Sequence, residues 1–265
     1  MLRAVCYALI LTSCESLSLA QDDPVPLTRV HAHNDYEHKQ PLTNALEHGF
    51  CSVEADIHLV ERKLLVAHDR NQVKFERSLQ SLYLDPLRDR VRKNGGRVYR
   101  NGPAFTLLID IKGDWHLTYP VLREILAQYS DVLTTFEVGT KKTNAIIAIL
   151  TSNRTKTMFE NESIRYAALD GSLDDLSSTE PAELIPWISS DWTQSFKWRG
   201  AGVLEEAERL RVRQIVAQAH RHGRRVRFWG APDQPVFWRE MLANDVDLIN
   251  TDDLEGAQKF LLGLK

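Results

Sequence analysis

Charged residues interrupt a run of the chain that otherwise has the composition of a buried β-strand. Between Cys51 and Leu59, apolar residues alternate with Glu54, Asp56 and His58. Because side chains in a strand alternate between its two faces, the two carboxylates should share one face. Two like charges so close together are costly to remove from water, and a divalent cation is the simplest group that neutralises both. The pattern therefore predicts a metal site on this strand.

Other residues with suitable chemistry lie at or near the ends of further short apolar runs. His31 and His68 each end such a run, and Asp110 and Lys112 lie within a third. An imidazole can take or give a proton near neutral pH. A lone histidine or a single Glu-x-Asp pair is most often a solvated or core group, but recurrence at several run ends indicates one shared site.

Eight apolar runs supply the strands that must position these residues. Helical patterns fall between several of them, and no linker or low-complexity segment divides the chain. This alternation predicts a single parallel (β/α)8 TIM barrel, in which chemistry is placed at the carboxyl ends of the strands. The predicted strands are 28–31, 51–59, 105–112, 145–150, 164–169, 185–190, 224–229 and 247–251, with 63–67 as a hairpin-like extension.

An open doubly wound sheet is the alternative fold. A dinucleotide site in such a sheet would need a Gly-x-Gly-x-x-Gly turn after an early strand, and the chain has none. The barrel is therefore favoured. Its predicted helices are 41–48, 78–93 with an interruption at Pro86, 115–129, 204–221, 235–243 and 254–262.

The N-terminal residues have the pattern of an export signal. Arg3 precedes an apolar run, and Ser18-Leu19-Ala20 is a small-x-small cleavage pattern. The run is shorter than the ~20 residues that a membrane-spanning helix needs. Removal of residues 1–20 would leave one domain over 28–265, either periplasmic or secreted. The segment ending in Cys14 is an alternative processing site, at which the cysteine would be lipidated.

The overall composition is that of a soluble globular protein, with 43% hydrophobic and 26% charged residues and a formal net charge of -3. This balance gives no indication of a nucleic-acid surface. It also implies no obligate protein partner.

Taken together, the motifs resemble the phosphatidylinositol-phospholipase-C-like phosphodiesterase superfamily, and within it the glycerophosphodiester phosphodiesterase and sphingomyelinase D branches. Ala32 and His33 replace the Arg and Gly that follow the first histidine in glycerophosphodiesterases, which favours the other branch. The motifs that carry the resemblance are His31-x-x-Asn34, Glu54-x-Asp56, His68-Asp69, Asp110-x-Lys112 and Trp229 at the end of a late strand.

The resemblance implies a metal-dependent phosphodiesterase acting on glycerophosphodiesters or phospholipid-type diesters, with peripheral membrane contact if the substrate is a lipid. Oxygen ligands favour Mg²⁺ or Ca²⁺ as the single cation. Asp69 is expected only to cap a turn. The implied residues are His31 and His68 as base and acid, Glu54, Asp56 and Asp110 as metal ligands, and Lys112, Asn34 and Trp229 as substrate contacts. Lys112 could instead simply pair with Asp110.

Two other functions stay open at this point. Metal-dependent hydrolases of the amidohydrolase or PHP kind also begin a barrel with a His-x-His pair, as in His31-x-His33. They would need further His or Asp ligands at late strand ends. A non-catalytic exported binding protein is the second alternative, because a barrel scaffold does not fix function.

Overall fold

The computed structural model describes residues 23–137, 139–151, 157, 159 and 162–263. Eight parallel strands follow one another in the order β11, β10, β9, β7, β4, β2, β1, β12. A parallel bridge between Arg227 and Leu248 links the two ends of this series. The sheet is therefore a nearly closed TIM-like barrel, as the sequence predicts, and the open doubly wound alternative is wrong.

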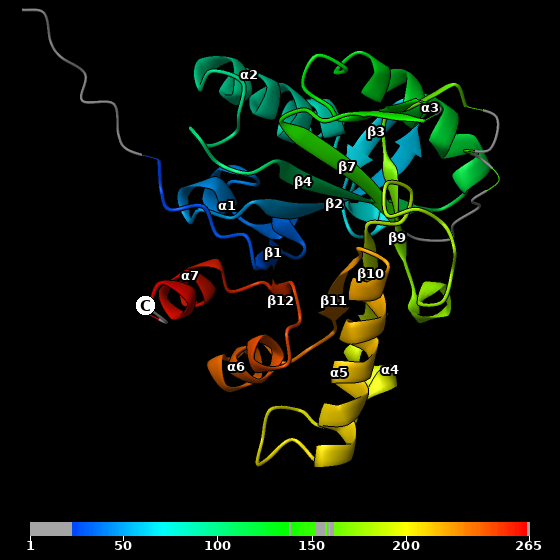
Figure 1. Ribbon diagram of the computed structural model, residues 1–265. Coiled ribbons are helices and arrows are strands. Elements are labelled where there is room, and N and C mark those ends of the chain that lie inside the picture. The colour runs from blue at the N-terminus through cyan, green and yellow to red at the C-terminus, as the bar shows by residue number, and fades with distance from the viewer. Residues whose placement is uncertain (1–22, 138, 152–156, 158, 160–161, 264–265) are drawn as a thin grey trace, which may run out of the picture.

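The barrel strands lie close to their predicted positions. Helices surround them on the outside (Figure 1). The strands are β1 Val30–Ala32, β2 Ser52–Val60, β4 Phe105–Lys112, β7 Ile146–Thr151, β9 Ala168–Gly171, β10 Trp187–Asp191, β11 Arg225–Trp229 and β12 Ile249–Thr251. The helices are α1 Thr43–Glu47, α2 Asp85–Lys93, α3 Trp115–Ala127, α4 Trp192–Ser195, α5 Glu206–Arg221, α6 Pro235–Ala243 and α7 Leu254–Leu262.

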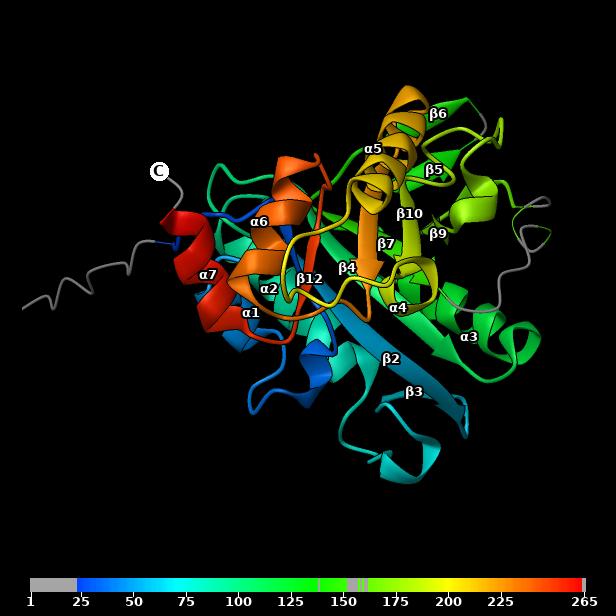
Figure 2. The same cartoon turned by 90° about the horizontal axis from the view of Figure 1, so that it is seen from below.

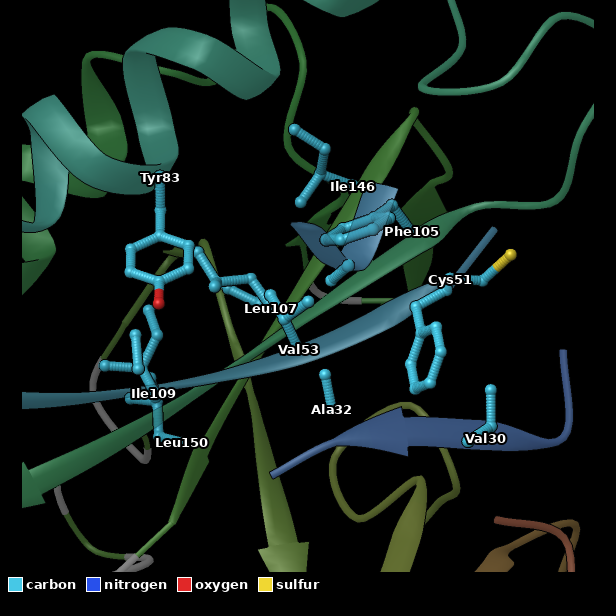
Figure 3. Close-up of a cluster of buried hydrophobic side chains, with 14 of the residues drawn as sticks. Val30, Ala32, Cys51, Val53, Tyr83, Phe105, Leu107, Ile109, Ile146 and Leu150 are labelled. Atoms are coloured by element: carbon cyan, nitrogen blue, oxygen red, sulfur yellow. The ribbon is translucent and has the colours of Figure 1, made fainter. Parts of the chain in front are cut away.

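Alternation along the strands separates the core from the site. Val53, Leu107 and Ile109 belong to the large buried cluster between strands and helices, toward which Tyr83 reaches from the helical layer (Figure 3). Positions of opposite parity point into the barrel, where Leu108 belongs to a second apolar cluster. Two residues further along the same strand, Asp110 pairs in register with Asp56. The barrel interior is therefore apolar at one level and charged nearer the carboxyl ends of the strands.

The predicted extension of the second strand is confirmed. β3, Lys63–Val66, pairs antiparallel with the end of β2, and the two form a hairpin at one side of the barrel (Figure 2). It returns the chain toward the mouth of the barrel, where His68 follows it.

Two sequence predictions require correction. The predicted strand 164–169 is divided: β8, Ile164–Arg165, joins β5, Thr135–Glu137, and β6, Thr140–Lys142, in a small antiparallel sheet. The barrel strand β9 instead ends at Gly171, where a Cβ would lie 2.6 Å from both Ile185 Cγ2 and Trp187 O. Only glycine allows this close approach.

Pro86 does not interrupt a helix. It lies in the first turn of α2, directly after a π-helical turn over Gln80–Leu84. The first turn tolerates proline because its backbone N–H would have no partner within the helix.

Within the described residues, no helix has both the length and the apolar composition needed to cross a bilayer. The predicted signal segment 1–20, with Cys14, lies outside the described residues.

Candidate functional site

Three carboxylates from two adjacent strands converge at the mouth of the barrel. Glu54 and Asp56 on β2 and Asp110 on β4 each offer an oxygen, and these oxygens all lie within 4.8 Å of one another. Asp56 Oδ1 is buried and has no hydrogen-bond partner among the described residues. A hard divalent cation prefers such an all-oxygen set. The three residues predicted as metal ligands therefore lie where one cation could contact all of them.

Lys112 is the cation beside this cluster. Its ammonium nitrogen lies 3.0 Å from Asp56 Oδ2 and 2.5 Å from Asp110 Oδ2, so the alternative of a pairing with Asp110 is observed, while the predicted substrate contact stays a prediction. Burial raises the pKa of Asp56 to about 6, and repulsion from Glu54 and Asp110 adds to this shift. Burial likewise raises the pKa of Asp110, although Lys112 opposes the change. The carboxylates thus still favour additional positive charge.

Tyr36 links the loop after β1 to the cluster. Its hydroxyl lies 2.7 Å from Asp56 Oδ2, 2.8 Å from Asn34 Oδ1 and 3.1 Å from His68 Nδ1. Asn34 has a left-handed backbone, with φ of 47°, a conformation that asparagine tolerates better than most residues. This turn leads the chain from β1 into the 3-10 turn Asp35–Glu37, which carries Tyr36. Sequence analysis missed Tyr36, whose one signal was its place in the first strand's loop.

The three histidines of this region differ in exposure. The side chain of His68 is 51% exposed, and its Nδ1 lies 3.1 Å from Asp56 Oδ2. The side chain of His33 is 25% exposed, with Nδ1 3.0 Å from Asp252 Oδ1. His31 has no exposed surface.

His31 lies beneath Glu54. Its Nδ1 is 2.7 Å from Ser52 Oγ, and its Nε2 is 3.4 Å from Glu54 Oε2. Burial lowers the pKa of His31 to about 4, so the ring is neutral at pH 7. The predicted pair of His31 and His68 therefore does not line one cavity, whereas His33 and His68 do.

These residues surround a cavity of about 280 Å³. Seven of the eight residues predicted for the site line this cavity, and His31 is the exception. Its lining is His33, Asn34, Glu54, Asp56, His68, Asp110, Lys112, Thr151, Arg227 and Trp229.

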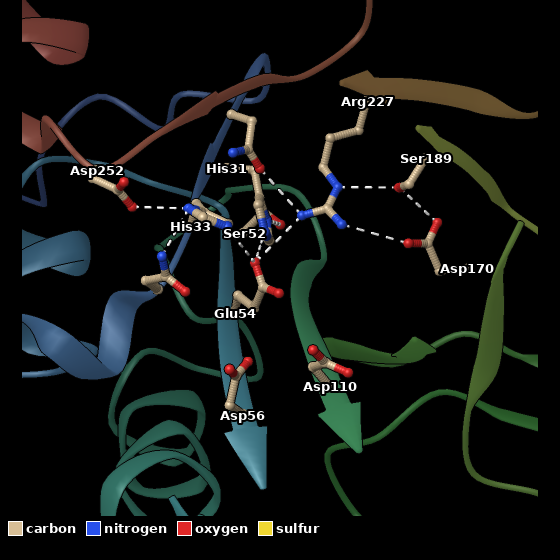
Figure 4. Close-up of polar contacts among 12 residues, drawn as sticks. His31, His33, Ser52, Glu54, Asp56, Asp110, Asp170, Ser189, Arg227 and Asp252 are labelled. Carbon is tan, nitrogen blue, oxygen red and sulfur yellow. Dashed lines mark hydrogen bonds and ion pairs between the residues drawn. The ribbon is translucent and has the colours of Figure 1, made fainter. Parts of the chain in front are cut away.

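Arg227 is the buried cation of the barrel interior. From β11 it places Nη1 3.4 Å from Glu54 Oε2 and Nη2 3.5 Å from Asp170 Oδ2, while Nε donates to Ser189 Oγ over 3.1 Å (Figure 4). Burial alone would raise the pKa of Glu54, but the hydrogen bond to His31 and the charge of Arg227 more than offset it and hold this pKa below its usual range. Sequence analysis missed Arg227, whose signal was its alternation with apolar residues on a predicted strand.

A second, larger cavity adjoins the first. Its volume is about 510 Å³, and it shares Thr151 and Trp229 with the first cavity. Trp229 is 39% exposed, so it is available to a ligand at this boundary.

Comparison with known proteins adds independent information. The AIM6-like phosphodiesterase domain family matches residues 20–170, more than half of the chain. "Altered inheritance of mitochondria protein 6" of Eremothecium gossypii is 32% identical, over 91% of this chain and 71% of that protein. The protein of the same name from Zygosaccharomyces rouxii is 29% identical, over 89% of this chain and 69% of that protein.

Two solved structures share the fold. A calcium-dependent phosphoinositol-specific phospholipase C from a Gram-negative Pseudomonas species has a TM-score of 0.59 at 14% identity, covering 86% of this chain and 89% of that one. A glycerophosphodiester phosphodiesterase from Parabacteroides distasonis has a TM-score of 0.54 at 16% identity, covering 92% and 99%.

Proposed function

Because this chain belongs to the AIM6-like phosphodiesterase domain family, we propose that it is a metal-dependent phosphodiesterase acting on small or lipid-derived phosphodiesters. One observation carries the proposal. Three carboxylates and two partly exposed imidazoles line the same cavity at the mouth of the barrel. Barrel enzymes place their reacting groups at this end.

Glu54, Asp56 and Asp110 would hold the cation, and the buried, unpartnered Asp56 Oδ1 supports this assignment. When bound, a divalent cation supplies positive charge that neutralises the phosphodiester and orients a nonbridging oxygen. Calcium is the first ion to test, because the donor set is all oxygen and one structural neighbour is described as calcium-dependent. Lys112 would give the phosphate a second positive contact.

His33 and His68 would share the proton transfers. One imidazole takes the proton of a substrate hydroxyl next to the phosphorus, and that oxygen bonds to phosphorus. The bond from phosphorus to the leaving oxygen then breaks, and the other imidazole protonates that oxygen. Water can open the resulting cyclic phosphate by the reverse proton transfers. In this proposal the substrate's own hydroxyl is the nucleophile; the described lining of the cavity holds no serine or cysteine, and its one side-chain hydroxyl is that of Thr151.

This assignment departs from the sequence prediction at two residues, His31 and Asn34. His31 contacts Ser52 and Glu54 and has no exposed surface, so we assign it the orientation of Glu54 rather than proton transfer. We also assign Asn34 a role other than the predicted substrate contact. Its side chain lies 3.0 Å from His33 Nδ1 and 2.8 Å from the Tyr36 hydroxyl, which suits a role in positioning both rings. Trp229 keeps its predicted role at the cavity boundary.

The test measures turnover and metal binding separately. Turnover of a lysophospholipid and a glycerophosphodiester is followed by phosphorus NMR after chelation and after readdition of Ca²⁺ or Mg²⁺. We expect turnover to require a cation and a cyclic phosphate to appear. Asp110→Asn should abolish the rise in melting temperature that the cation gives the wild type, because binding stabilises only a state with an intact site.

Asp69→Asn is the matched control. Asp69 follows His68 but caps the 3-10 turn Arg70–Gln72, as predicted, and asparagine caps about as well. Cation binding should therefore persist in this variant. Full turnover after exhaustive chelation would contradict the proposed metal dependence.

Two alternatives receive less support. A His-x-His hydrolase would need His31 and His33 in one ligand set, but His31 lies under Glu54 and the metal-compatible group found among the described residues contains only carboxylates. A binding protein would not require paired imidazoles at the phosphate position. Absence of turnover with every cation, together with retained phosphodiester binding, would favour it.

We also propose export, with residues 1–20 removed and 28–265 forming the phosphodiesterase domain. Arg3, the apolar run and Ser18-Leu19-Ala20 support this proposal. N-terminal mass analysis of the protein from its native host tests it: a mature N-terminus after Ala20, or a lipid-modified Cys14, is expected on export. An intact Met1 would contradict both routes.

A further inference from the structure

The turn after β12 holds His33 by both its backbone and its side chain. The backbone N–H of His33 donates to Thr251 O over 3.0 Å, and the ring Nδ1 lies 3.0 Å from Asp252 Oδ1 (Figure 4). β1 and β12 pair in register at Ala32 and Thr251, directly before these contacts. The orientation of the His33 ring therefore depends on how this turn is itself held.

Asp233 is the residue that holds the turn. It lies in the loop between β11 and α6, and its Oδ1 accepts from the Thr251 hydroxyl over 2.5 Å. Its Oδ2 accepts from the backbone N–H groups of Asp252 and Asp253 over 2.8 Å and 3.0 Å. We propose that Asp233 is a positioning residue that determines, through Asp252, which ring nitrogen of His33 carries the proton. The proposal rests on the phosphodiesterase function proposed above, in which His33 transfers a proton.

Two neighbours of His33 Nδ1 have opposite requirements. An ionised carboxylate only accepts, so Asp252 requires a proton on Nδ1. The side-chain nitrogen of Asn34 also lies 3.0 Å from Nδ1, and an N–H donated from there requires that Nδ1 has no proton. In the neutral ring these two requirements correspond to the two tautomers of imidazole.

The charged acceptor should prevail while it is held in place. A hydrogen bond to an ionised group is roughly twice as strong as one between neutral groups. The Asn34 amide can also turn and present its oxygen to Nδ1 instead. However, the Asp252 side chain is 61% exposed, and an exposed pair alone contributes little to keeping its own geometry. The hydrogen bonds to Asp233 therefore decide which neighbour controls Nδ1.

The tautomer decides what His33 can do in the cavity. With the proton on Nδ1, the ring has a lone pair on Nε2, which lies 4.0 Å from Glu54 Oε2 in the cavity lining. This nitrogen can then take the proton of a substrate hydroxyl. With the proton on Nε2, the ring has no base at that position. Asp233 is not among the described residues that line either cavity, so its effect on turnover is indirect.

The test reads the tautomer of His33 by ¹⁵N NMR at a pH where the ring is neutral, with its signals identified by their loss in His33→Ala. We expect Nδ1–H in the wild type and mainly Nε2–H in Asp233→Ala. Asp252→Ala should show the same change, and it alters an exposed side chain without removing a bond within the turn. Asp233→Asn should keep the wild-type tautomer, because its oxygen still accepts from the two N–H groups and its NH2 can donate to the Thr251 hydroxyl.

Turnover gives a second readout. Asp233→Ala should lower kcat by up to about 100-fold with little change in KM or cation affinity, the scale expected when a reacting group is misplaced. Adding Asp233→Ala to Asp252→Ala should have almost no further effect, because Asp233 acts through Asp252. Asp114→Ala is the matched control. Asp114 also accepts from two backbone N–H groups, at the start of α3, and its loss should leave the His33 tautomer and kcat unchanged.

The outcomes separate this inference from the proposed function. If no diester is cleaved with any cation but Asp233→Ala moves the proton to Nε2, the proposed function fails and the positioning role stands. If the wild type carries the proton on Nε2, or if Asp233→Ala leaves it on Nδ1, the positioning role is wrong whatever the turnover. An equal loss of kcat from Asp233→Ala with and without the Asp252 carboxylate would also contradict it.

Discussion

The hydroxyl of Tyr36 donates to Asp56 Oδ2 over 2.7 Å, which connects the loop after β1 to the carboxylate cluster on β2. Asp56 is buried, and its other oxygen has no hydrogen-bond partner among the described residues. Tyr36 is therefore the hydroxyl donor that holds this carboxylate in place.

Tyr36→Phe should weaken cation binding or turnover by about 10- to 100-fold, the usual effect of removing a group that orients a metal ligand. Calorimetric titration with Ca²⁺ measures it. Tyr99→Phe is the control, because the Tyr99 hydroxyl donates to the backbone oxygen of Phe50, away from the cluster. An equal loss of cation affinity in both variants would show a general loss of stability instead.

Exchange of the histidines distinguishes proton transfer from positioning. His33→Ala and His68→Ala should each lower kcat by about 10²- to 10⁴-fold with nearly unchanged cation affinity, because each removes a group proposed as the acid or base. His31→Asn should instead raise the cation concentration required, since His31 orients Glu54. His222→Ala, at the exposed end of α5, is the control.

The opposite result would support His31 and His68, the acid and base predicted from sequence. It would be a large loss of kcat in His31→Asn at saturating cation, together with normal turnover in His33→Ala.

Arg227→Met should destabilise the fold strongly. It leaves Glu54 and Asp170 buried without their shared cation, and breaking a buried ion pair by removing one partner typically costs about 3–5 kcal/mol. Urea unfolding measures this loss. Arg209→Met removes an arginine that pairs with Glu206 and Glu240 on the helical surface and should cost far less. Similar losses in the two variants would argue against a special role for the interior arginine.

Asp35 should make stability depend on pH. Burial raises its pKa from 3.8 to about 6, although Leu42 N–H and the Tyr83 hydroxyl donate to its Oδ2. The folded state therefore binds this proton more tightly than the unfolded state. The resulting stabilisation is complete below pH ~4 and is lost as the pH rises through about 6, and a shift of about two units corresponds to about 3 kcal/mol.

Asp35→Asn cannot titrate and isolates this effect. The unfolding free energy of the wild type minus that of the variant should fall by about 3 kcal/mol between pH 4 and pH 8. Urea unfolding at both pH values measures it, with Asp89→Asn on the surface as the control. A difference that is constant with pH would contradict the raised pKa.

Local sequence patterns were sufficient for most of the barrel. The period-two alternation around Glu54 and Asp56 predicted their common face, and the run ending in Asp110 and Lys112 predicted β4 with the correct bounds. The resemblance to phosphodiesterases is confirmed by the matched family and by the two fold neighbours. The roles of the eight predicted site residues stay predictions.

The remaining features depend on contacts that no local pattern contains. Arg227 lies 173 residues from Glu54 along the chain, so their proximity appears only when the barrel is assembled. The difference in exposure between His31 and His33 also arises only in the assembled barrel. The two histidines lie two positions apart at the end of one strand, and they differ only in the residues that pack around them. The division of the strand predicted over 164–169 depends on a pairing with β5 that its own composition does not indicate.

Because Arg227 pairs with both Glu54 and Asp170, the complete site forms only when distant parts of the chain come together in the barrel. Glu54 comes from β2, whereas Arg227 comes from β11 near the other end of the chain. If the gene were split between β9 and β10, one fragment would carry the carboxylate cluster and the other its interior cation. If the chain has the proposed phosphodiesterase activity, turnover would return only when the fragments associate, and catalysis would measure fragment association.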